Sequence, residues 1–347
     1  HPGRAWAMEQ GGIRLPPMSH LPIAPNAPWL APLAGFSDLP FRLLCRELGA
    51  VVAVTEMVSA KGLFYDSRNT RRLLATCPAD APLVVQLFGA EPDPLARAAA
   101  SLAETGYTYF DLNCGCSVRK VVKTRAGAAL LSAPDRLVAC AAAMVQVAGP
   151  GRVGVKLRLG PKPPARVDLE VADRLAEAGV AWLTLHPRYA SQGFAGVADH
   201  DALAAFVAAS PVPVLASGDL MSAADGQRVL GHTGASGVMY ARGAMADPRI
   251  FAHHAALYPC ADALPGPLPP VCEIIRRHAA LCREYADDRQ ALLRMRTAVP
   301  RYLRHVPGCR ALRARLCRVD SWEELGQIID EAEGLSHAPT PVAGEMS

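Results

Sequence analysis

The strongest constraint on the fold is an alternation of short apolar runs with longer amphipathic runs, from about residue 29 to residue 257. Short apolar runs are typical of buried strands, and the amphipathic runs between them are typical of helices. Eight strands are predicted, at Trp29–Leu33, Val51–Thr55, Leu83–Phe88, Tyr107–Leu112, Val153–Leu157, Ala181–His186, Val214–Ser217 and Gly237–Tyr240. Because helices separate the strands, the sheet is predicted to be parallel.

A closed barrel and an open doubly wound sheet both fit this alternation. The count of eight favours an α/β fold of the (β/α)8 TIM-barrel type, and no G-x-G-x-x-G follows the first strand to indicate a dinucleotide-binding sheet. Helices are predicted at Leu39–Leu48, Asp93–Thr105, Pro134–Val147, Val167–Ala178 and Ala223–Leu230. Ser37 is the expected N-cap of the first helix, and Gly49 is its expected stop.

Composition changes divide the chain into a barrel and a smaller helical region. Residues 1–28 are predicted to be an N-terminal extension and residues 29–258 the barrel. Residues 259–270, with five prolines and one glycine, are predicted to be a stiff linker. A small helical domain is expected over 271–335, with helices at Val271–Ala286, Arg289–Arg304, Arg310–Arg318 and from Ser321, where Glu324 completes a capping-box pattern. The last stretch, 336–347, is predicted to be a disordered tail.

Positive charge is concentrated in the helical region. The chain has a net charge of +4, but residues 271–318 hold twelve arginines against four acidic residues. This distribution predicts a polyanionic partner. No run of 18 apolar residues predicts a membrane span, and ten cysteines without a C-x-x-C pair indicate a reduced, cytoplasmic chain with no metal site.

Polar side chains stand at nearly every predicted strand end. In parallel barrels the functional residues gather at the C-terminal ends of the strands. The ends carry Glu56, Gln86, Asn113 with Cys114 and Cys116, Lys156 with Arg158, His186 with Arg188, Ser217-Gly218-Asp219 and Ala241-Arg242. The sequence therefore predicts one active site at that end of the barrel.

Several of these segments together resemble the tRNA-dihydrouridine synthase family. The segments are Pro32–Asp38, Gln86–Gly89, Asp111–Cys116, Lys156–Gly160 and Arg242–Ala244, and the resemblance extends from about Pro32 to Arg318. It implies a TIM barrel with FMN at its mouth, NADPH as the transient reductant, and tRNA as substrate, with ribosomal RNA as an alternative. The implied reaction reduces the C5–C6 bond of uridine to 5,6-dihydrouridine, with hydride from reduced FMN to C6.

Cys116 is the predicted acid of this reaction. Reduction of the C5–C6 bond needs a proton at C5, and a cysteine on a loop at a strand end can deliver it. Cys114 is predicted to be a packing residue. Lys156 is expected to favour the anionic reduced ring by Coulomb attraction, and Arg242 to bind the phosphate of FMN. The predicted cofactor-binding residues are Pro32, Leu33, Ala34, Gln86, Asn113, Lys156, His186, Ser217, Gly218, Asp219, Ala241 and Arg242.

RNA contact is predicted for two groups of basic residues, because phosphate neutralisation dominates affinity for nucleic acids. The groups are Arg119, Lys120, Lys123 and Arg125 in the loop after Cys116, and Arg294, Arg296, Arg301 and Arg304 in the helical region. No protein partner is implied. A buried structural role for Gln86 or His186, and a solvated position for Lys156 or the basic residues, are the alternatives for single residues.

Two other functions also fit the sequence. One is an FMN barrel reductase acting on a free pyrimidine-like molecule, which gives no reason for the basic helical region. The other is an RNA-binding barrel with weakened catalysis. It is favoured by Ser217 and Ala241, which stand where the resembled family usually has asparagine and glycine, and disfavoured by Cys116, Gln86 and Lys156.

Overall fold

A computed structural model of the chain describes residues 21, 23–65, 68–258 and 267–337. All strands pair in parallel in one sheet, in the order β2-β1-β9-β8-β7-β6-β5-β4-β3, and a further pairing of β2 with β4 closes it into a barrel. The strands are β1 Ala27–Leu30, β2 Val52–Val54, β3 Val58–Ser59, β4 Leu83–Phe88, β5 Tyr109–Asn113, β6 Val153–Arg158, β7 Trp182–His186, β8 Val214–Ala216 and β9 Gly237–Tyr240. The predicted TIM barrel is therefore confirmed, with β3 as a two-residue addition beside the end of β4.

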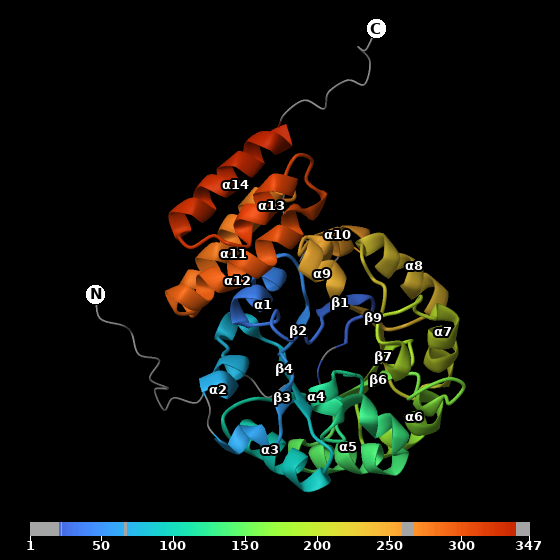
Figure 1. Cartoon of the computed structure of the whole chain (residues 1–347). Helices are drawn as coiled ribbons and strands as arrows, with labels where there is room; N and C mark the ends of the chain where they lie inside the picture. The colour runs from blue at the N-terminus through green and yellow to red at the C-terminus, as the bar shows by residue number, and fades with distance from the viewer. Residues whose placement is uncertain (1–20, 22, 66–67, 259–266, 338–347) are drawn as a thin grey trace.

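Helices surround the barrel and continue into a helical region at one side, beside α1 (Figure 1). Around the barrel lie α1 Leu39–Glu47, α2 Arg68–Leu74, α3 Pro92–Glu104, α4 Arg119–Val122, α5 Pro134–Ala148, α6 Val167–Glu177, α7 His200–Ala209, α8 Ala223–Thr233, α9 Arg242–Ala246 and α10 Ile250–Leu257. The C-terminal helices are α11 Val271–Tyr285, α12 Asp288–Tyr302, α13 Arg310–Leu316 and α14 Trp322–His337. Short 3₁₀ turns are η1 Gly62–Tyr65, η2 Pro78–Asp80, η3 Gly127–Ser132, η4 Ala190–Gln192 and η5 Leu303–His305.

Most of the predicted N-terminal extension, linker and tail lies outside the described residues. Of the predicted tail, Ser336 and His337 continue α14. Among the residues that are described, no helix has the length and hydropathy needed to cross a membrane.

The first helix begins at Leu39, as predicted, but its N-cap lies one residue later than predicted. Asp38 is the cap, since its Oδ1 accepts a hydrogen bond from Phe41 N at 3.2 Å. The Ser37 hydroxyl is used elsewhere, because it accepts a hydrogen bond from Leu33 N at 2.9 Å and closes the loop that joins β1 to α1. Gly49 stands just past the helix end at φ +107°, as expected for a C-terminal stop.

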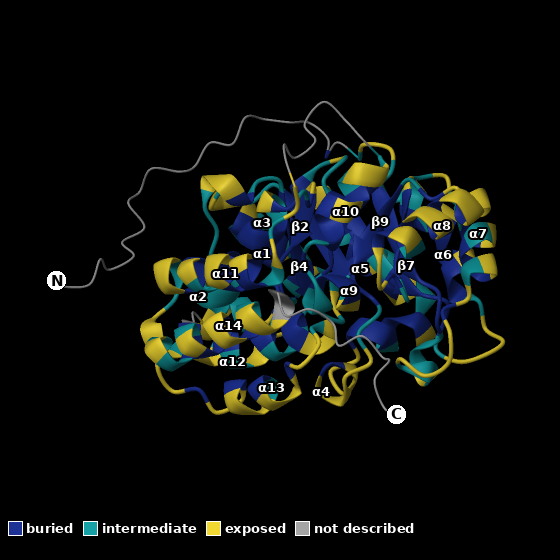
Figure 2. Cartoon of the chain, turned by 90° about the horizontal axis from the view of Figure 1, so that it is seen from above, coloured by how far each residue is buried: buried dark blue, intermediate teal, exposed yellow. Residues whose placement is uncertain are grey.

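The strand pleat divides the barrel residues into two cores, which Figure 2 shows as the buried centre of the molecule. Outward-facing strand residues pack with the surrounding helices in one large core. Inward-facing residues at the N-terminal ends fill the barrel with a second core that includes Trp29, Val52, Tyr109, Trp182 and Met239. Because this core closes the barrel from below, polar inward-facing groups are left to the other end.

A glycine in β6 makes room for the large residues of the inner core. A Cβ atom on Gly154 would lie 2.0 Å from the Trp182 ring, and the rings of Trp182 and Trp29 lie 5.8 Å apart. We expect Gly154→Ala to lower the free energy of unfolding by about 1–3 kcal/mol through overpacking. Urea denaturation measures this. The control is Gly231→Ala in α8, where nothing lies within 4 Å, and that variant is expected to be neutral or slightly stabilising.

Candidate active site

The candidate active site is the ring of polar side chains at the C-terminal ends of the strands. Residues two apart along a strand face the same side, so the inward-facing series that begins in the apolar core ends in polar residues here. Tyr109 continues to Asp111 and Asn113, and Trp182 continues to Thr184 and His186. The ring consists of Glu56, Gln86, Asp111, Asn113, Lys156, Arg158, Thr184, His186 and Ser217.

Gln86 and Asn113 belong to one buried chain of hydrogen bonds. Gln86 Nε2 donates to Asp111 Oδ2 at 2.7 Å, and Asn113 Nδ2 donates to Gln86 Oε1 at 2.8 Å. Burial raises the pKa of Asp111 to about 7, while the hydrogen bond from Gln86 and the charge of Lys156 oppose the rise. Gln86 Nε2 uses one of its two N–H groups on Asp111, so its second N–H is left to donate to a ligand.

The turn that carries Cys116 is fixed from three sides. Asn113 Oδ1 accepts from Cys116 N at 2.9 Å, and Arg158 Nε donates to Gly115 O at 2.9 Å. Ala128 N donates to Cys116 O at 2.9 Å, so the segment after the loop also holds the turn. Cys116 itself is half-buried at the barrel mouth, which leaves its thiol accessible to a ligand there.

The Lys156 ammonium group is free to donate hydrogen bonds to a polar ligand. It has no hydrogen-bonding partner within the described part of the chain. Burial lowers the pKa of Lys156 to about 8; Arg158 lowers it further, and the Asp111 carboxylate opposes the change. Two buried oxygens, Asp111 Oδ1 and Thr184 Oγ1, also have no hydrogen-bonding partner among the described residues. Buried polar atoms are normally satisfied, so these groups fit a polar ring such as a flavin at the mouth.

His186 belongs to a cluster with two arginines and one carboxylate. Arg188 Nη1 lies 3.1 Å from His186 Nε2, and because arginine only donates, Nε2 is the acceptor and Nδ1 carries the proton. Burial first, and then nearby cations, lower the pKa of His186 to about 2, so its ring is neutral. Asp219 lies within 2.7 Å of both Arg188 and Arg242 and also accepts from Ala198 N. Asp219, a predicted cofactor-binding residue, is thus bound by two arginines, and its contact with the cofactor stays a prediction.

The loops after β8 and β9 carry five of the predicted cofactor-binding residues, Ser217, Gly218, Asp219, Ala241 and Arg242. Gly218 adopts φ +100°, and a Cβ there would lie 2.7 Å from the His186 ring, so the position requires glycine. Ser217 is buried beside it, while Ala241 is half-buried and the Arg242 side chain is 42% exposed. In the loop after β1, Pro32 and Leu33 are half-buried and Ala34 is exposed.

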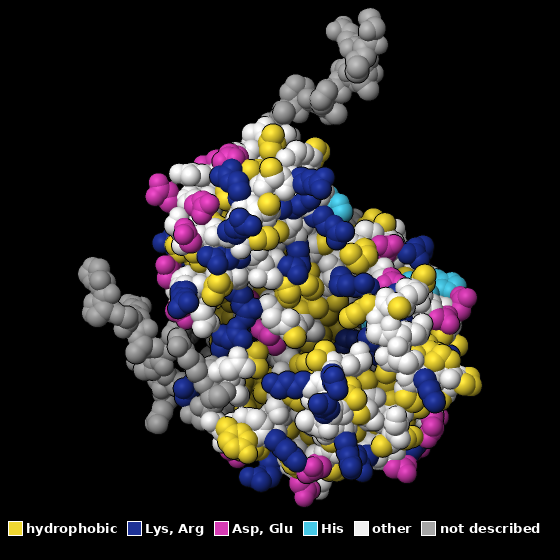
Figure 3. Space-filling view, in the orientation of Figure 1, with side chains coloured by type: hydrophobic (Ala, Val, Ile, Leu, Met, Phe, Trp, Pro, Cys, Tyr) yellow, Lys and Arg dark blue, Asp and Glu magenta, His cyan; other side chains and the backbone are white. Residues whose placement is uncertain are grey.

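The predicted RNA-contacting residues near Cys116 are all exposed. Arg119, Lys120, Lys123 and Arg125 have no ion pair within the described residues. Figure 3 shows basic side chains on this face and on the helical region above it, with a hollow between the two. Arg304 is exposed, and Arg301 lies over the Phe36 ring at 4.6 Å.

Arg294 and Arg296 do not fit the predicted RNA contact, because their guanidinium groups are bound within the protein. Arg294 pairs with Asp38 at 3.1 Å and also donates to Gly35 O. Arg296 donates to Val319 O. These side chains stabilise the helical region and its contact with the barrel.

Six residues of the site were missing from the predicted site residues, namely Glu56, Asp111, Arg158, Thr184, Arg188 and Phe194. All but Phe194 lie in or just after strands, and that position was the available signal. Phe194 is 63% exposed, and the guanidinium groups of Arg158 and Arg242 lie 5.7 and 5.0 Å from its ring centre. Nothing in the local sequence indicated these contacts.

Comparisons with known proteins show what this chain is similar to. The solved structure of morphinone reductase in complex with tetrahydroNAD overlaps with a TM-score of 0.48 at 13% identity, covering 70% of this chain and 90% of that chain. tRNA-dihydrouridine synthase B of Pseudomonas aeruginosa is 35% identical over 296 residues, covering 85% of this chain and 89% of that protein. Probable tRNA-dihydrouridine synthase of Mycobacterium tuberculosis is 33% identical over 332 residues, covering 91% of this chain and 84% of that protein. The profile of the dihydrouridine synthase family matches residues 29–336. The resemblance found in the sequence is thereby confirmed, and the chain belongs to the dihydrouridine synthase family of oxidoreductases.

Proposed function

We propose that the protein reduces the C5–C6 bond of uridine in tRNA to 5,6-dihydrouridine, with FMN at the barrel mouth and NADPH as reductant. The observation that carries the proposal is the fixed Cys116 turn beside Lys156 at a mouth rimmed by exposed basic residues. Bound FMN supplies the hydride to C6 of the uracil ring. Cys116 donates the proton to C5 and regains one from solvent, which reaches its half-buried thiol.

The groups without partners support a flavin at this place. Lys156 attracts the negative charge of the reduced ring, and the second N–H of Gln86 is available to a ring acceptor. Arg242 is oriented by Asp219 and binds the phosphate, together with backbone N–H groups after β8 and β9. The neutral His186 ring can donate a hydrogen bond from Nδ1 to an acceptor on the flavin.

The basic face supports RNA as the substrate. A stacked uridine must turn out of its helix to reach a barrel mouth, at a cost of about a few kcal/mol. The four exposed basic residues after Cys116, with the exposed Arg304 of the helical region, offer phosphate contacts that offset this cost. A reductase of a free pyrimidine has no need of this surface.

Absorbance of the purified protein tests the proposal. A flavin spectrum that bleaches with NADPH, and returns anaerobically on addition of unmodified tRNA but not of free uridine, is expected. Return with free uridine would favour the small-molecule reductase. A colourless protein that FMN does not reconstitute would contradict the reductase and favour an RNA-binding barrel.

The charge of Lys156 gives a separate prediction. We expect Lys156→Met to weaken FMN binding about 10-fold, because a charge-assisted contact is lost. The ammonium group is charged below its pKa of about 8 and loses its charge as the pH rises through that value. Wild-type affinity should therefore fall above about pH 8, and the variant should show a flatter profile. Quenching of FMN fluorescence measures both. Lys162→Met, an exposed lysine after the same strand, is the control and should bind FMN like the wild type.

A further inference from the structure

Glu56 follows β2 at the barrel mouth, and neither the proposed proton transfer nor the proposed flavin contacts use it. Its side chain is only 8% exposed, and its Oε2 accepts a hydrogen bond from Gly35 N at 2.5 Å. Gly35 belongs to the mouth loop, which we define as residues 32–37 between β1 and α1. This loop includes three proposed flavin contacts, at residues 32–34, so Glu56 fixes their backbone from the side of β2.

Arg294 holds the same loop from the helical region. This α12 side chain donates to Gly35 O, so both backbone groups of Gly35 are bound, one by each region. Its Nε lies 3.1 Å from Asp38 Oδ2, and its Nη2 lies 3.6 Å from Glu56 Oε1. One guanidinium group therefore joins the mouth loop, the cap of α1 and the end of β2.

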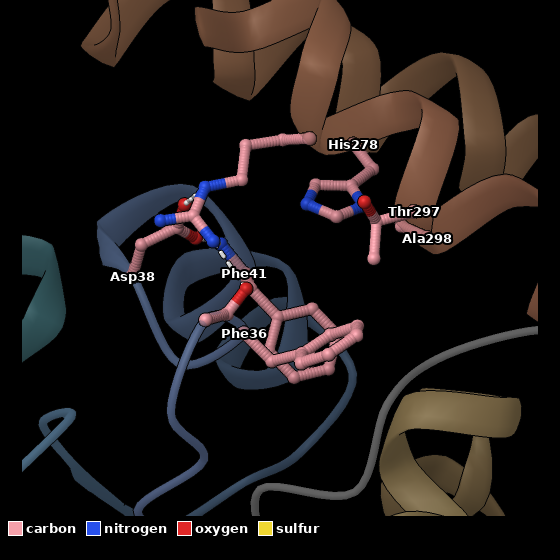
Figure 4. A pocket seen from close by; sticks show the side chains of 8 residues that line it. Phe36, Asp38, Phe41, His278, Thr297 and Ala298 are labelled. Atoms are coloured by element: carbon pink, nitrogen blue, oxygen red, sulfur yellow. Dashed lines mark hydrogen bonds and ion pairs between the residues drawn. The ribbon is translucent and has the colours of Figure 1, made fainter. Parts of the chain in front are cut away.

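The contact continues along α12. Arg301 lies over the Phe36 ring, one residue farther along the mouth loop. Figure 4 shows Phe36, Asp38 and Phe41 on the barrel side facing His278 and Thr297 on the helices. The cavity between them holds about 10 Å³, which leaves room for no ligand larger than a water molecule. The place is a packed contact between the two regions.

Charge makes this contact sensitive to the loss of either partner. Burial raises the pKa of both Asp38 and Glu56, and the charge of Arg294 opposes both rises. Arg294 thus pairs with the buried carboxylate of Glu56 and the half-buried carboxylate of Asp38. Removing one member of a buried ionic group leaves the others without compensation, which costs far more than loss of an exposed pair.

We propose that Glu56 is a positioning residue that, together with Arg294, couples the seating of the helical region to the placement of the mouth loop against the flavin. The part of the inference that concerns flavin rests on the proposed function. The part that concerns the mouth loop rests on the contacts of Glu56 and Arg294 with Gly35. Because coupling between two events is reciprocal, FMN binding also favours the seated helical region.

Four variants and one matched control test the coupling. Glu56→Gln keeps the shape and removes the charge, Arg294→Met removes the guanidinium group, and the third combines them. The control is Arg277→Ala, which removes an exposed ion pair with Glu47 (2.8 Å) that joins the same two regions away from the mouth loop. Arg294→Lys, which keeps the charge, tests for rescue.

Three readouts are compared, each on the full chain. Amide hydrogen exchange of residues 33–37, in protein stripped of flavin, should become about 10-fold faster in both single variants. FMN affinity should fall about 10-fold, and flavin oxidation at saturating tRNA should slow while the half-saturating tRNA concentration stays within about 2-fold. The double variant should be no worse than the worse single variant, Arg294→Lys should recover part of the loss, and Arg277→Ala should match the wild type.

If folded Glu56→Gln and Arg294→Met exchange at wild-type rates and bind FMN with wild-type affinity, the proposal is wrong. It is also wrong if their effects multiply as for independent sites, or if Arg277→Ala matches them. If the wild type binds no FMN, the proposed function fails instead, and hydrogen exchange alone still decides whether Glu56 and Arg294 fix the loop together.

Discussion

Replacing Cys116 by alanine is expected to stop the oxidation of reduced flavin by tRNA while its reduction by NADPH continues unchanged. The thiol is the proposed proton donor to C5, and loss of a positioned general acid slows a reaction by about 10²–10⁴-fold. Its backbone is held by Asn113 and Ala128, so the turn is expected to survive the substitution. Anaerobic stopped-flow absorbance separates the two steps.

The matched control is Cys114→Ala, two residues earlier in the same segment. Cys114 is fully buried in the outer core, and burial raises the pKa of its thiol well above the ordinary value. This variant should lose stability and keep the rate of flavin oxidation within about 3-fold, as expected for a packing residue. An unchanged oxidation rate in Cys116→Ala would place the proton donor elsewhere.

Replacing Arg42 by methionine is expected to lower the free energy of unfolding by about 3–5 kcal/mol. Arg42 and Asp80 are fully buried, and the Arg42 guanidinium group makes two hydrogen bonds to Asp80 Oδ2, at 2.9 and 2.7 Å. It also donates to Ser37 O and Ala75 O, both at 2.7 Å. The substitution leaves these acceptors unsatisfied in the protein interior, where water cannot replace the arginine. Urea denaturation monitored by circular dichroism measures the change.

Arg174→Met is the corresponding exposed variant. Arg174 pairs with Asp135 at the same 2.7 Å, but the two side chains are 37% and 96% exposed. Water solvates the Asp135 carboxylate after the substitution, so the free energy of unfolding should fall by no more than about 1 kcal/mol. Equal losses in the two variants would show that burial is not what makes the Arg42 contact important.

The strand pattern was predictable because burial in a parallel barrel imposes apolar runs of fixed length. Leu83–Phe88 and Gly237–Tyr240 have the predicted bounds. β1 begins at Ala27, two residues before its predicted start. Proline is unusual inside a strand because it lacks an N–H, but the Pro28 carbonyl still accepts a hydrogen bond from Val51 N. Helices α2 and α7 were not among those predicted. α2 has three arginines in seven residues, and α7 is apolar on most sides, so neither shows a clear amphipathic period.

Local sequence also located the candidate site. A barrel places the C-terminal ends of its strands at one mouth, so Gln86, Asn113, Lys156 and His186 were expected together before any contact was known. Their separate roles were less predictable. Asn113 uses its oxygen to hold the Cys116 turn, and that contact depends on the conformation of the turn.

The sequence by itself determined the fold class, the end of the barrel that carries the polar residues, and the family. These follow from periodicity and from motifs whose residues lie close together in the chain. Only the tertiary structure decided which charges pair. Arg294 is 238 residues from Glu56, and Arg188 is 31 residues from Asp219. An arginine in an amphipathic helix has the same local sequence pattern whether it binds a phosphate or a buried carboxylate. Its partner is decided by which distant segment of the chain packs against the helix.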